Sequence, residues 1–381
     1  MVDFHLNSNA GKRCSTPSVA ADSPISFHRL LPGYEPSELR TAAGLAERLG
    51  VGEIWVKEES NRFGLPAYKV LGASWAIYNQ LLANTGVAAT GRKLEALRAA
   101  LSGQGFTLVT ATDGNHGRAV ARVARWFGLE SEVFVPGEMA EVRTQALRAE
   151  GARVVVVRGS YDEAVRAAAA SADERRLLIQ DTSWPGYERV PAWIVEGYGT
   201  IFQEVETQLE ELGSRAPNLI PVQVGVGSLA HAATSHFRRL DPGSRLVCVE
   251  PKGADCLLRS ARAGRSVTVN GPHASCMAGL NCGTASAISL PTLLSGVDAF
   301  LAISDERAFE AMRLLASEGV VAGESGAAGL AGLLEIVETP ELARALDVGR
   351  DSRVLVIVTE ADTDPVAYER AVGRSSREVR R

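Results

Sequence analysis

Cysteine is scarce in this sequence. The five cysteines among 381 residues form no C-x-x-C pair and stand beside no pair of histidines. Structural zinc sites need closely spaced Cys or His ligands, and secreted disulfide scaffolds use many paired cysteines, so both kinds of protein are excluded. Long uncharged apolar runs are also missing, so we expect no transmembrane helix and no membrane partner.

Positive charge is in short supply as well. The chain has 40 Lys and Arg against 45 Asp and Glu, a net charge of -5, and its basic residues cluster only near the end. A surface that follows a phosphate backbone needs clustered basic side chains, so no nucleic-acid partner is expected. The polar N-terminal stretch lacks the apolar core of a secretion signal, which predicts a cytoplasmic protein.

Apolar runs of strand length alternate with helical stretches rich in Ala, Leu and Arg. Runs such as ARVVVVRG and SRVLVIVTE are apolar at consecutive positions, as is typical of parallel strands covered on both faces. The pattern predicts an α/β protein with a doubly wound fold. Ligands of such folds bind beyond the carboxyl ends of the strands, so the residues after each run are the candidates for chemistry.

Lys69 follows the Gly- and Pro-containing loop NRFGLPAY and begins an apolar helical stretch. Desolvation among apolar neighbours would lower the pKa of its ammonium and leave a neutral amine. Such an amine can form a Schiff base with an aldehyde such as pyridoxal phosphate. The alternative is an ordinary solvated lysine at the start of a helix.

The turn ATDGNHG lies between a predicted strand and an Ala-rich helix. Its exposed N–H groups and the helix dipole suit a substrate carboxylate beside Thr112 and Asp113, and Asn115 could donate to a ring hydroxylate. The alternative is ordinary helix capping, and His116 taken alone is interpreted as structural.

A second turn, GVGSLA, offers a phosphate site made of Gly225, Val226, Gly227 and Ser228. With Glu250 at the end of the next strand, it matches a dinucleotide fingerprint and indicates a nicotinamide oxidoreductase. The same turn suits the single phosphate of pyridoxal phosphate equally well. Lys69 has no evident task in a dinucleotide enzyme, which favours pyridoxal phosphate.

Thr359 ends the last strand, where a neutral hydroxyl could meet a pyridine nitrogen. Unlike a carboxylate, a hydroxyl does not hold that nitrogen protonated, and this favours β-elimination over transamination. Helix capping by Thr359 is the alternative.

Together the motifs NRFGLPAYKVLGAS, ATDGNHGRAVA, QDTSWPGY, GVGSLAHA, CMAGLNCG, GESGAAGL and VTEADTD resemble the diaminopropionate ammonia-lyase family. The resemblance spans nearly the whole chain. It implies pyridoxal 5'-phosphate as cofactor and the tryptophan-synthase-β-like type II fold, with two doubly wound sheets that have helices on both faces. It further implies α,β-elimination of 2,3-diaminopropionate to pyruvate and ammonia by a homodimer, without a metal.

The resemblance also implies the site residues. Lys69 is the Schiff-base lysine and the base for the L-isomer, Asp113 serves the opposite face for the D-isomer, and Asp181 receives a substrate amino group. The cofactor-binding residues are Lys69, Asn115, Gly225, Val226, Gly227, Ser228 and Thr359. The substrate-binding residues are Thr112, Asp113 and Asp181.

Some positions depart from the family pattern. They are Pro66 and Tyr68 before the lysine, Asn281 in CMAGLNCG and Ala361 in TEADTD. The runner-up function is therefore β-elimination or β-replacement on another 3-substituted alanine, serine or threonine. Cys256 and Cys282 flank this segment and could pair, although reduced thiols are the rule in the cytoplasm.

The length exceeds that of a single core, so we expect two domains. A large cofactor-binding domain is predicted from 1–72 plus 173–381, and a small inserted domain from 73–172. Residues 1 to about 25 and roughly the last nine are predicted to be mobile.

Overall fold

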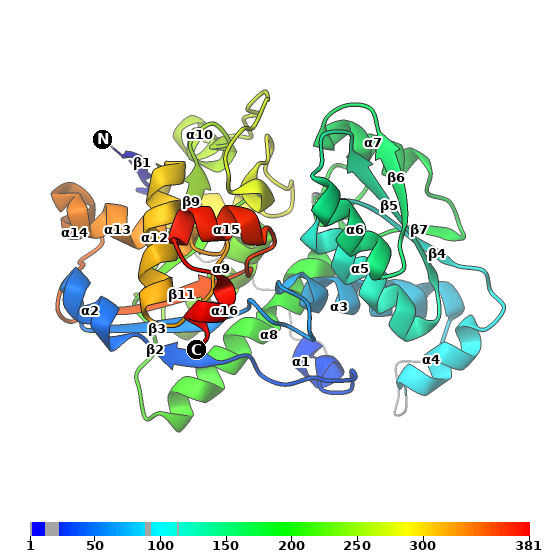
Figure 1. Cartoon of the computed structure of the whole chain (residues 1–381), viewed down its shortest axis with the longest axis horizontal. Helices are drawn as coiled ribbons and strands as arrows, with labels where there is room; N and C mark the ends of the chain where they lie inside the picture. The colour runs from blue at the N-terminus through cyan, green and yellow to red at the C-terminus, as the bar shows by residue number, and fades with distance from the viewer. Residues whose placement is uncertain (1, 12–22, 88–92, 113) are drawn as a thin grey trace. The chain divides into compact units, whose positions relative to one another are not determined.

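The computed structural model describes residues 2–11, 23–87, 93–112 and 114–381. The chain divides into two compact units (Figure 1). The larger unit comprises Met1–Val19, Pro36–Ala67 and Ile201–Arg381, and the smaller unit comprises Ala20–Glu35 and Tyr68–Thr200. The predicted insertion 73–172 lies within the smaller unit, which extends further at both ends.

A sheet of seven strands, in the order β1-β10-β9-β8-β11-β3-β2, forms the centre of the larger unit. Its inner strands are parallel, and β1 and β2 pair antiparallel at the two edges. The elements of this unit are β1 (Asp3–Leu6), β2 (Leu39–Thr41), α2 (Ala43–Leu49), β3 (Glu53–Glu58), β8 (Leu219–Gln223), α9 (Ser228–Leu240), β9 (Arg245–Pro251), α10 (Cys256–Ala263), η1 (Ala278–Leu280), α11 (Leu290–Gly296), β10 (Ala299–Ile303), α12 (Asp305–Ser317), α13 (Ala328–Glu338), α14 (Pro340–Ala345), β11 (Arg353–Val358), α15 (Pro365–Val372) and α16 (Ser376–Val379).

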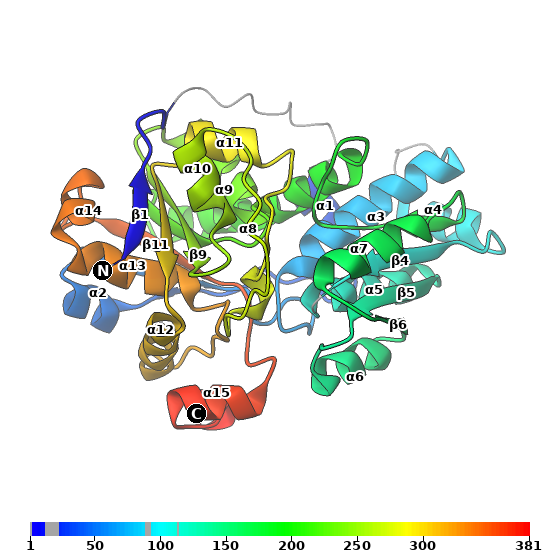
Figure 2. The ribbon, with the colours of Figure 1, turned by 90° about the horizontal axis from the view of Figure 1, so that it is seen from above.

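Helices cover both faces of the seven-stranded sheet (Figure 2). Val354, Val356 and Val358 of β11 belong to one apolar cluster with residues of α2, α12 and α13. Leu355 and Ile357 alternate with them, are equally buried and point to the opposite face, where α9 packs on β8. This two-sided burial explains why the strand sequences are apolar at consecutive positions.

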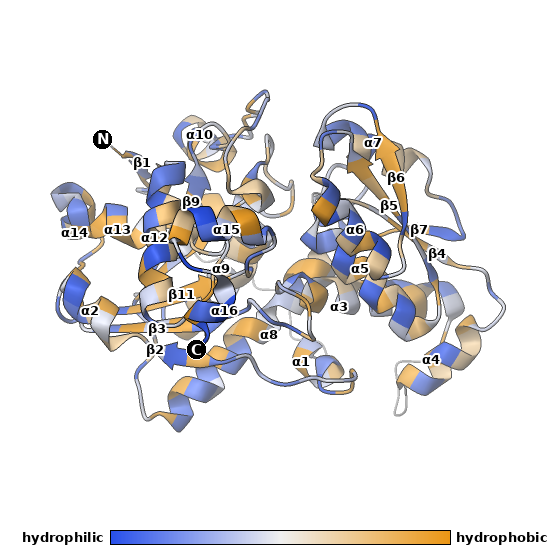
Figure 3. Cartoon of the chain, in the orientation of Figure 1, coloured by the Kyte–Doolittle hydropathy of each residue, from blue (hydrophilic) through white to orange (hydrophobic). Residues whose placement is uncertain are grey.

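A parallel sheet of four strands, in the order β6-β5-β4-β7, forms the centre of the smaller unit. In β5, Phe134 joins a cluster with α7, whereas Val133 and Val135 join a cluster on the other face. Figure 3 shows the hydrophobic colouring of β5 and β6. The elements are α1 (Pro24–His28), α3 (Lys69–Thr85), α4 (Lys93–Leu101), β4 (Thr107–Ala111), α5 (Asn115–Phe127), β5 (Glu130–Pro136), α6 (Glu141–Ala149), β6 (Arg153–Val157), α7 (Tyr161–Ala170), β7 (Arg176–Leu178) and α8 (Arg189–Glu211), which continues into the larger unit.

Helices α3 and α8 approach each other closely within the smaller unit. A Cβ atom on Gly72 would lie 2.5 Å from Tyr198 Cε1 and 2.8 Å from the Ile194 carbonyl oxygen. A Cβ atom on Gly197 would lie 2.6 Å from the Leu71 carbonyl oxygen. Only glycine allows this approach, which brings the Tyr198 ring against the first turn of α3.

The predicted α/β fold with two helix-covered sheets is confirmed, and every strand expected from an apolar run is present. The two short antiparallel edge strands were not expected. Asp3–Leu6 form β1 on β10, and Ser376–Val379 form α16 with Val379 buried. The mobility predicted for the two ends of the chain stays a prediction. Across the described residues, no helix combines the length and apolarity needed to cross a bilayer.

Candidate active site

The loop that leads to Lys69 is anchored in the larger unit by a buried ion cluster. Arg62 Nη2 lies 2.5 Å from Glu59 Oε1 and 2.7 Å from Glu204 Oε2, and Lys57 Nζ lies 2.8 Å from the same Glu204 oxygen. All four side chains are almost completely excluded from solvent. Two cations and two carboxylates balance in charge, so this cluster is read as a structural anchor for the loop.

Lys69 is the first residue of α3, and its ammonium pairs with Asp181. Nζ lies 2.7 Å from Asp181 Oδ2, across 112 positions of sequence. Burial acts to lower the pKa of Lys69, but the Asp181 carboxylate and the nearby Tyr198 and Tyr68 outweigh it and raise this pKa well above its usual value. The expectation that desolvation leaves a neutral amine is therefore wrong, because it did not include the Asp181 carboxylate.

Asp181 lies just beyond β7 and is ionised. Burial alone would raise the pKa of its carboxyl, but chiefly the Lys69 ammonium, 2.7 Å away, brings this pKa down to about 2. The neighbouring Gln180 side chain is held by Tyr161 and by the backbone N–H of Ala111, and its amide nitrogen lies 3.4 Å from Asp181 Oδ1. The carboxylate is thus positioned by its surroundings as well as by the ion pair.

His116, interpreted from sequence as structural, lies beside Asp181. Its Nε2 is 2.8 Å from the Ile179 carbonyl oxygen, and its Nδ1 is 3.9 Å from Asp181 Oδ2. Since a carbonyl can only accept, Nε2 carries the ring proton and Nδ1 presents a lone pair. Burial lowers the pKa of His116, which keeps the ring neutral. The GNHG motif contained this residue, but sequence alone did not show which group it would face.

The turn before α5 is built around Thr112. The Thr112 hydroxyl oxygen accepts the N–H groups of Gly114 and Gly117 at 2.9 and 3.1 Å, and so caps the helix. A Cβ atom on Gly117 would lie 2.4 Å from Thr112 Cγ2, which explains the glycine. Asn115 begins the helix, and Asp113 lies outside the described residues. The substrate-binding role of Thr112 stays a prediction. Its hydroxyl oxygen already accepts two backbone N–H groups.

The turn predicted to bind phosphate, residues 225–228, lies between β8 and α9 in the larger unit. Gly227 adopts a left-handed φ of 101°, and a Cβ atom there would lie 2.9 Å from Leu293 Cδ1. A Cβ atom on Gly225 would lie 3.1 Å from the Gly279 carbonyl oxygen. The N-cap residue of α9 is Gly227, so this 13-residue helix has no N-cap side chain that could accept its first N–H groups. Val226 and Ser228 complete the turn, whose geometry suits a phosphate group.

Thr359 follows β11, and its hydroxyl oxygen accepts a hydrogen bond from Gln223, a residue not predicted from the sequence. Gln223 Nε2 lies 2.8 Å from the Ile357 carbonyl oxygen and 2.9 Å from Thr359 Oγ1. The same amide nitrogen also lies 3.2 Å from the Gly326 carbonyl oxygen, and since an amide nitrogen can only donate, the Thr359 oxygen is the acceptor in its bond with Gln223. A polar residue within the buried run LIPVQ was the signal for this contact.

Glu250 performs a task different from ribose binding. Its two carboxyl oxygens accept the N–H groups of Leu257 and Leu258, both at 2.8 Å, at the start of α10. The side chain is fully buried, and burial raises its pKa to about 8. A helix-capping carboxyl without solvent access cannot bind a ribose hydroxyl, which removes the basis of the nicotinamide alternative. In the same region, Cys256 and Cys282 are both thiols.

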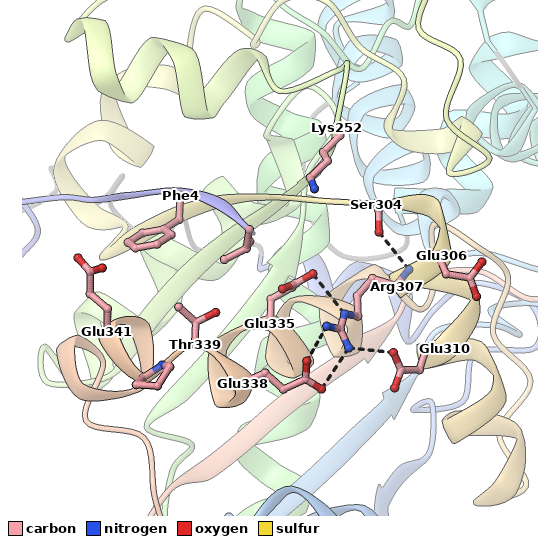
Figure 4. A pocket seen from close by; sticks show the side chains of 12 residues that line it. Phe4, Lys252, Ser304, Glu306, Arg307, Glu310, Glu335, Glu338, Thr339 and Glu341 are labelled. Atoms are coloured by element: carbon pink, nitrogen blue, oxygen red, sulfur yellow. Dashed lines mark hydrogen bonds and ion pairs between the residues drawn. The ribbon is translucent and has the colours of Figure 1, made fainter.

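A cavity of about 710 Å³ opens elsewhere on the larger unit (Figure 4). Its lining includes Lys252, and Arg307 forms ion pairs there with Glu310, Glu335 and Glu338. None of the predicted site residues lines this cavity. Its ion pairs are satisfied within the protein, so we assign it no catalytic role.

These residues fit pyridoxal phosphate. In the smaller unit, Lys69 begins a helix and pairs with a carboxylate; in the larger unit, a glycine turn begins a helix without an N-cap side chain, and the Thr359 hydroxyl oxygen accepts from Gln223. The described residues contain no cluster that could hold a metal ion. The family model "Pyridoxal-phosphate dependent enzyme" matches residues 30–360, so fold and site define an enzyme of the type II pyridoxal-phosphate class.

The relatives refine this class. The chain is 37% identical over 371 residues to the diaminopropionate ammonia-lyase of Salmonella typhimurium, with 92% of each chain covered. It is 36% identical over 357 residues to the diaminopropionate ammonia-lyase of Escherichia coli K12, with 91% of this chain and 89% of the relative covered. The crystal structure of the Escherichia coli enzyme in complex with D-serine matches with a TM-score of 0.89 at 33% identity, over 98% of this chain and 97% of that chain. The protein belongs to the diaminopropionate ammonia-lyase family, and it is a pyridoxal-phosphate-dependent ammonia-lyase.

Proposed function

We propose that this protein converts 2,3-diaminopropionate to pyruvate and ammonia by α,β-elimination. The observation that carries the proposal is the ion pair between Lys69 and Asp181 at 2.7 Å. It places a carboxylate that binds an ammonium group beside the amine proposed to hold the cofactor. Elimination of the β-amino group needs a carboxylate that binds this group as an ammonium, because the nitrogen at Cβ must stay protonated to leave as ammonia.

The proposed roles follow from this arrangement. Bound pyridoxal phosphate withdraws electrons and stabilises negative charge at Cα. Lys69 holds the cofactor and takes the Cα proton of the L-isomer, and Asp113 takes that of the D-isomer. Asp181, ionised at neutral pH, binds the β-ammonium group. The C–N bond then breaks with its electron pair moving to nitrogen, and water later releases pyruvate and a second ammonia.

The remaining predicted residues hold the cofactor and the substrate. We assign the phosphate to the turn of Gly225, Val226, Gly227 and Ser228, the ring oxygen to Asn115 and the pyridine nitrogen to Thr359. The substrate carboxylate is assigned to the turn after Thr112, where the start of α5 offers N–H groups and a favourable dipole.

A second candidate is β-elimination or β-replacement on another 3-substituted alanine, serine or threonine. It is favoured by Tyr68, whose ring centre lies 5.5 Å from Lys69 Nζ at a position where the family often carries Phe. Pro66 and Ala361, two other departures, are joined by a backbone hydrogen bond of 2.9 Å. Asn281 donates to the Ser275 carbonyl oxygen at 2.8 Å, so its amide nitrogen supports its own loop.

The deciding experiment is a visible spectrum of the purified protein with pyridoxal phosphate, followed by DL-2,3-diaminopropionate and a pyruvate-coupled assay. We expect a protein-bound cofactor band and sustained pyruvate formation, and both are lost in the variant Lys69→Ala. A band without pyruvate would move the substrate to the second candidate. Absence of any band in the wild-type protein would overturn the proposal.

We also propose that the protein is a cytoplasmic homodimer, the commonest symmetric assembly of enzymes. Light scattering coupled to size-exclusion chromatography measures the mass in solution. A mass that matches one chain of 40.4 kDa at working concentration would contradict the dimer. Fractionation of the source cells tests the compartment.

A further inference from the structure

His116 presents an unused lone pair in a charged and buried setting. The side chain is 4% exposed, and its Nε2–H is bound to the Ile179 carbonyl oxygen. Within the part of the chain that the structure describes, Nδ1 has no hydrogen-bond partner. A buried polar atom without a partner is costly and calls for an explanation, such as a bound water, an ion or a ligand.

The position of Nδ1 indicates the ligand. It lies 3.9 Å from Asp181 Oδ2, the oxygen that binds the Lys69 ammonium. Two acceptors on one tetrahedral ammonium, each at about 2.8 Å, are about 4.6 Å apart, so a spacing of 3.9 Å brings both within reach of a single nitrogen. An ammonium group has three N–H donors and satisfies both acceptors, whereas a hydroxyl has one donor and satisfies only one.

We propose that His116 Nδ1 and Asp181 Oδ2 together bind the β-ammonium group of the substrate, and that His116 thereby selects a diamino acid over serine or threonine. This inference rests on the proposed function and deepens it. In the structure, the Lys69 ammonium donates to Asp181 Oδ2. When Lys69 holds the cofactor, this oxygen becomes available to the substrate nitrogen, together with His116 Nδ1. A neutral His116 suits this role, because a protonated ring would repel the ammonium group.

Two substitutions separate the two ring nitrogens. His116→Gln keeps an amide N–H at the level of Nε2, where it can still reach Ile179, and removes the acceptor at the level of Nδ1. His116→Asn keeps an acceptor at the level of Nδ1. His236→Gln is the matched control, since His236 is a buried histidine of α9 for which we propose no role in binding.

The measurement is kcat/KM of the cofactor-loaded enzyme for L-2,3-diaminopropionate and for L-serine. We expect His116→Gln to lose at least about tenfold on the diamino acid while serine changes by less than about threefold. His116→Asn should recover a large part of the loss, and His236→Gln should leave the ratio of the two substrates unchanged. Equal losses of His116→Gln on both substrates, or no loss, would overturn the inference.

A readout independent of turnover is the nitrogen spectrum of the holoenzyme labelled with ¹⁵N-histidine, with the His116 signal assigned by its loss in His116→Gln. We expect a protonated Nε2 and an unprotonated Nδ1 at neutral pH. A proton on Nδ1 would overturn the inference even if the enzyme is active. A wild-type enzyme that binds cofactor but makes no pyruvate from the diamino acid would overturn the proposed function together with this inference.

Discussion

Gln223 Nε2 donates to the Thr359 hydroxyl oxygen at 2.9 Å and to the Ile357 carbonyl oxygen at 2.8 Å. The Thr359 oxygen therefore acts as an acceptor, and its own proton would be available to the pyridine nitrogen that we propose it meets. Thr359→Asp would place a carboxylate there and hold that nitrogen protonated, which favours transamination. We expect pyruvate formation from DL-2,3-diaminopropionate to fall at least about tenfold. Thr207→Asp, at an exposed position of α8, is the control, and an unchanged rate in Thr359→Asp would refute this role.

Asp181 makes the stability of the cofactor-free protein depend on pH in the acid range. Its folded-state pKa of about 2 is lower than the ordinary 3.8, so its contribution is complete above pH 3.8 and disappears as the pH falls toward 2. Asp181→Asn should lower the free energy of unfolding at pH 7 by about 2 kcal/mol and flatten the acid dependence. Urea unfolding at pH 7, 4 and 3 measures this, with the exposed Asp351→Asn as control. Parallel pH curves for the wild type and Asp181→Asn would count against the ion pair.

Gly227 is expected to tolerate no side chain. In Gly227→Ala, the left-handed backbone and the contact with Leu293 should cost about 1–3 kcal/mol of stability and weaken pyridoxal-phosphate binding at least about tenfold. Gly199→Ala is the matched control, because its Cβ atom would meet nothing within 4 Å inside helix α8. That variant should gain up to about 1 kcal/mol. Thermal unfolding and a cofactor titration give both quantities, and equal behaviour of the two variants would contradict the geometry.

The buried ion cluster around Arg62 predicts a large loss of stability when one member is removed. Arg62→Met leaves Glu59 and Glu204 with fewer partners and should cost about 3–5 kcal/mol. Arg40 pairs with Glu58 at the surface, and Arg40→Met should cost less than about 1 kcal/mol. Chemical denaturation compares the two variants directly. A cost for Arg62→Met no greater than that for Arg40→Met would show that the cluster contributes little.

The strands of both sheets could be predicted because two-sided burial makes their residues apolar at consecutive positions. The edge strands could not, since Asp3–Leu6 and Leu39–Thr41 are short and only partly buried. Strand β1 pairs with β10, which is distant in sequence. Strand β2 pairs with β3, whose sequence carries no local signal of an edge partner. Edge strands of this kind are determined by tertiary contacts and not by periodicity.

The site shows a similar limit. Lys69, the turn from Gly225 to Ser228 and Thr359 could be predicted as site residues because each follows a loop or strand end with a recognisable composition. The protonation of Lys69 could not be predicted, because its direction depends on Asp181, 112 positions away. The tautomer of His116 likewise depends on the Ile179 carbonyl, and the orientation of Thr359 depends on Gln223. Residue types indicate chemistry, whereas protonation states depend on contacts between distant segments.

The contact of α3 with α8 at Gly72 and Gly197 also has a consequence for how this enzyme could be redesigned. Lys69 lies in the first turn of α3, and close contacts at Gly72 and Gly197 set the distance between α3 and α8. A side chain introduced at Gly72 or Gly197 would push α3 away from α8 and so shift the Lys69 amine relative to Asp181. Attempts to broaden the substrate range should therefore vary the loops around the carboxylates and leave these two glycines as an invariant reference point.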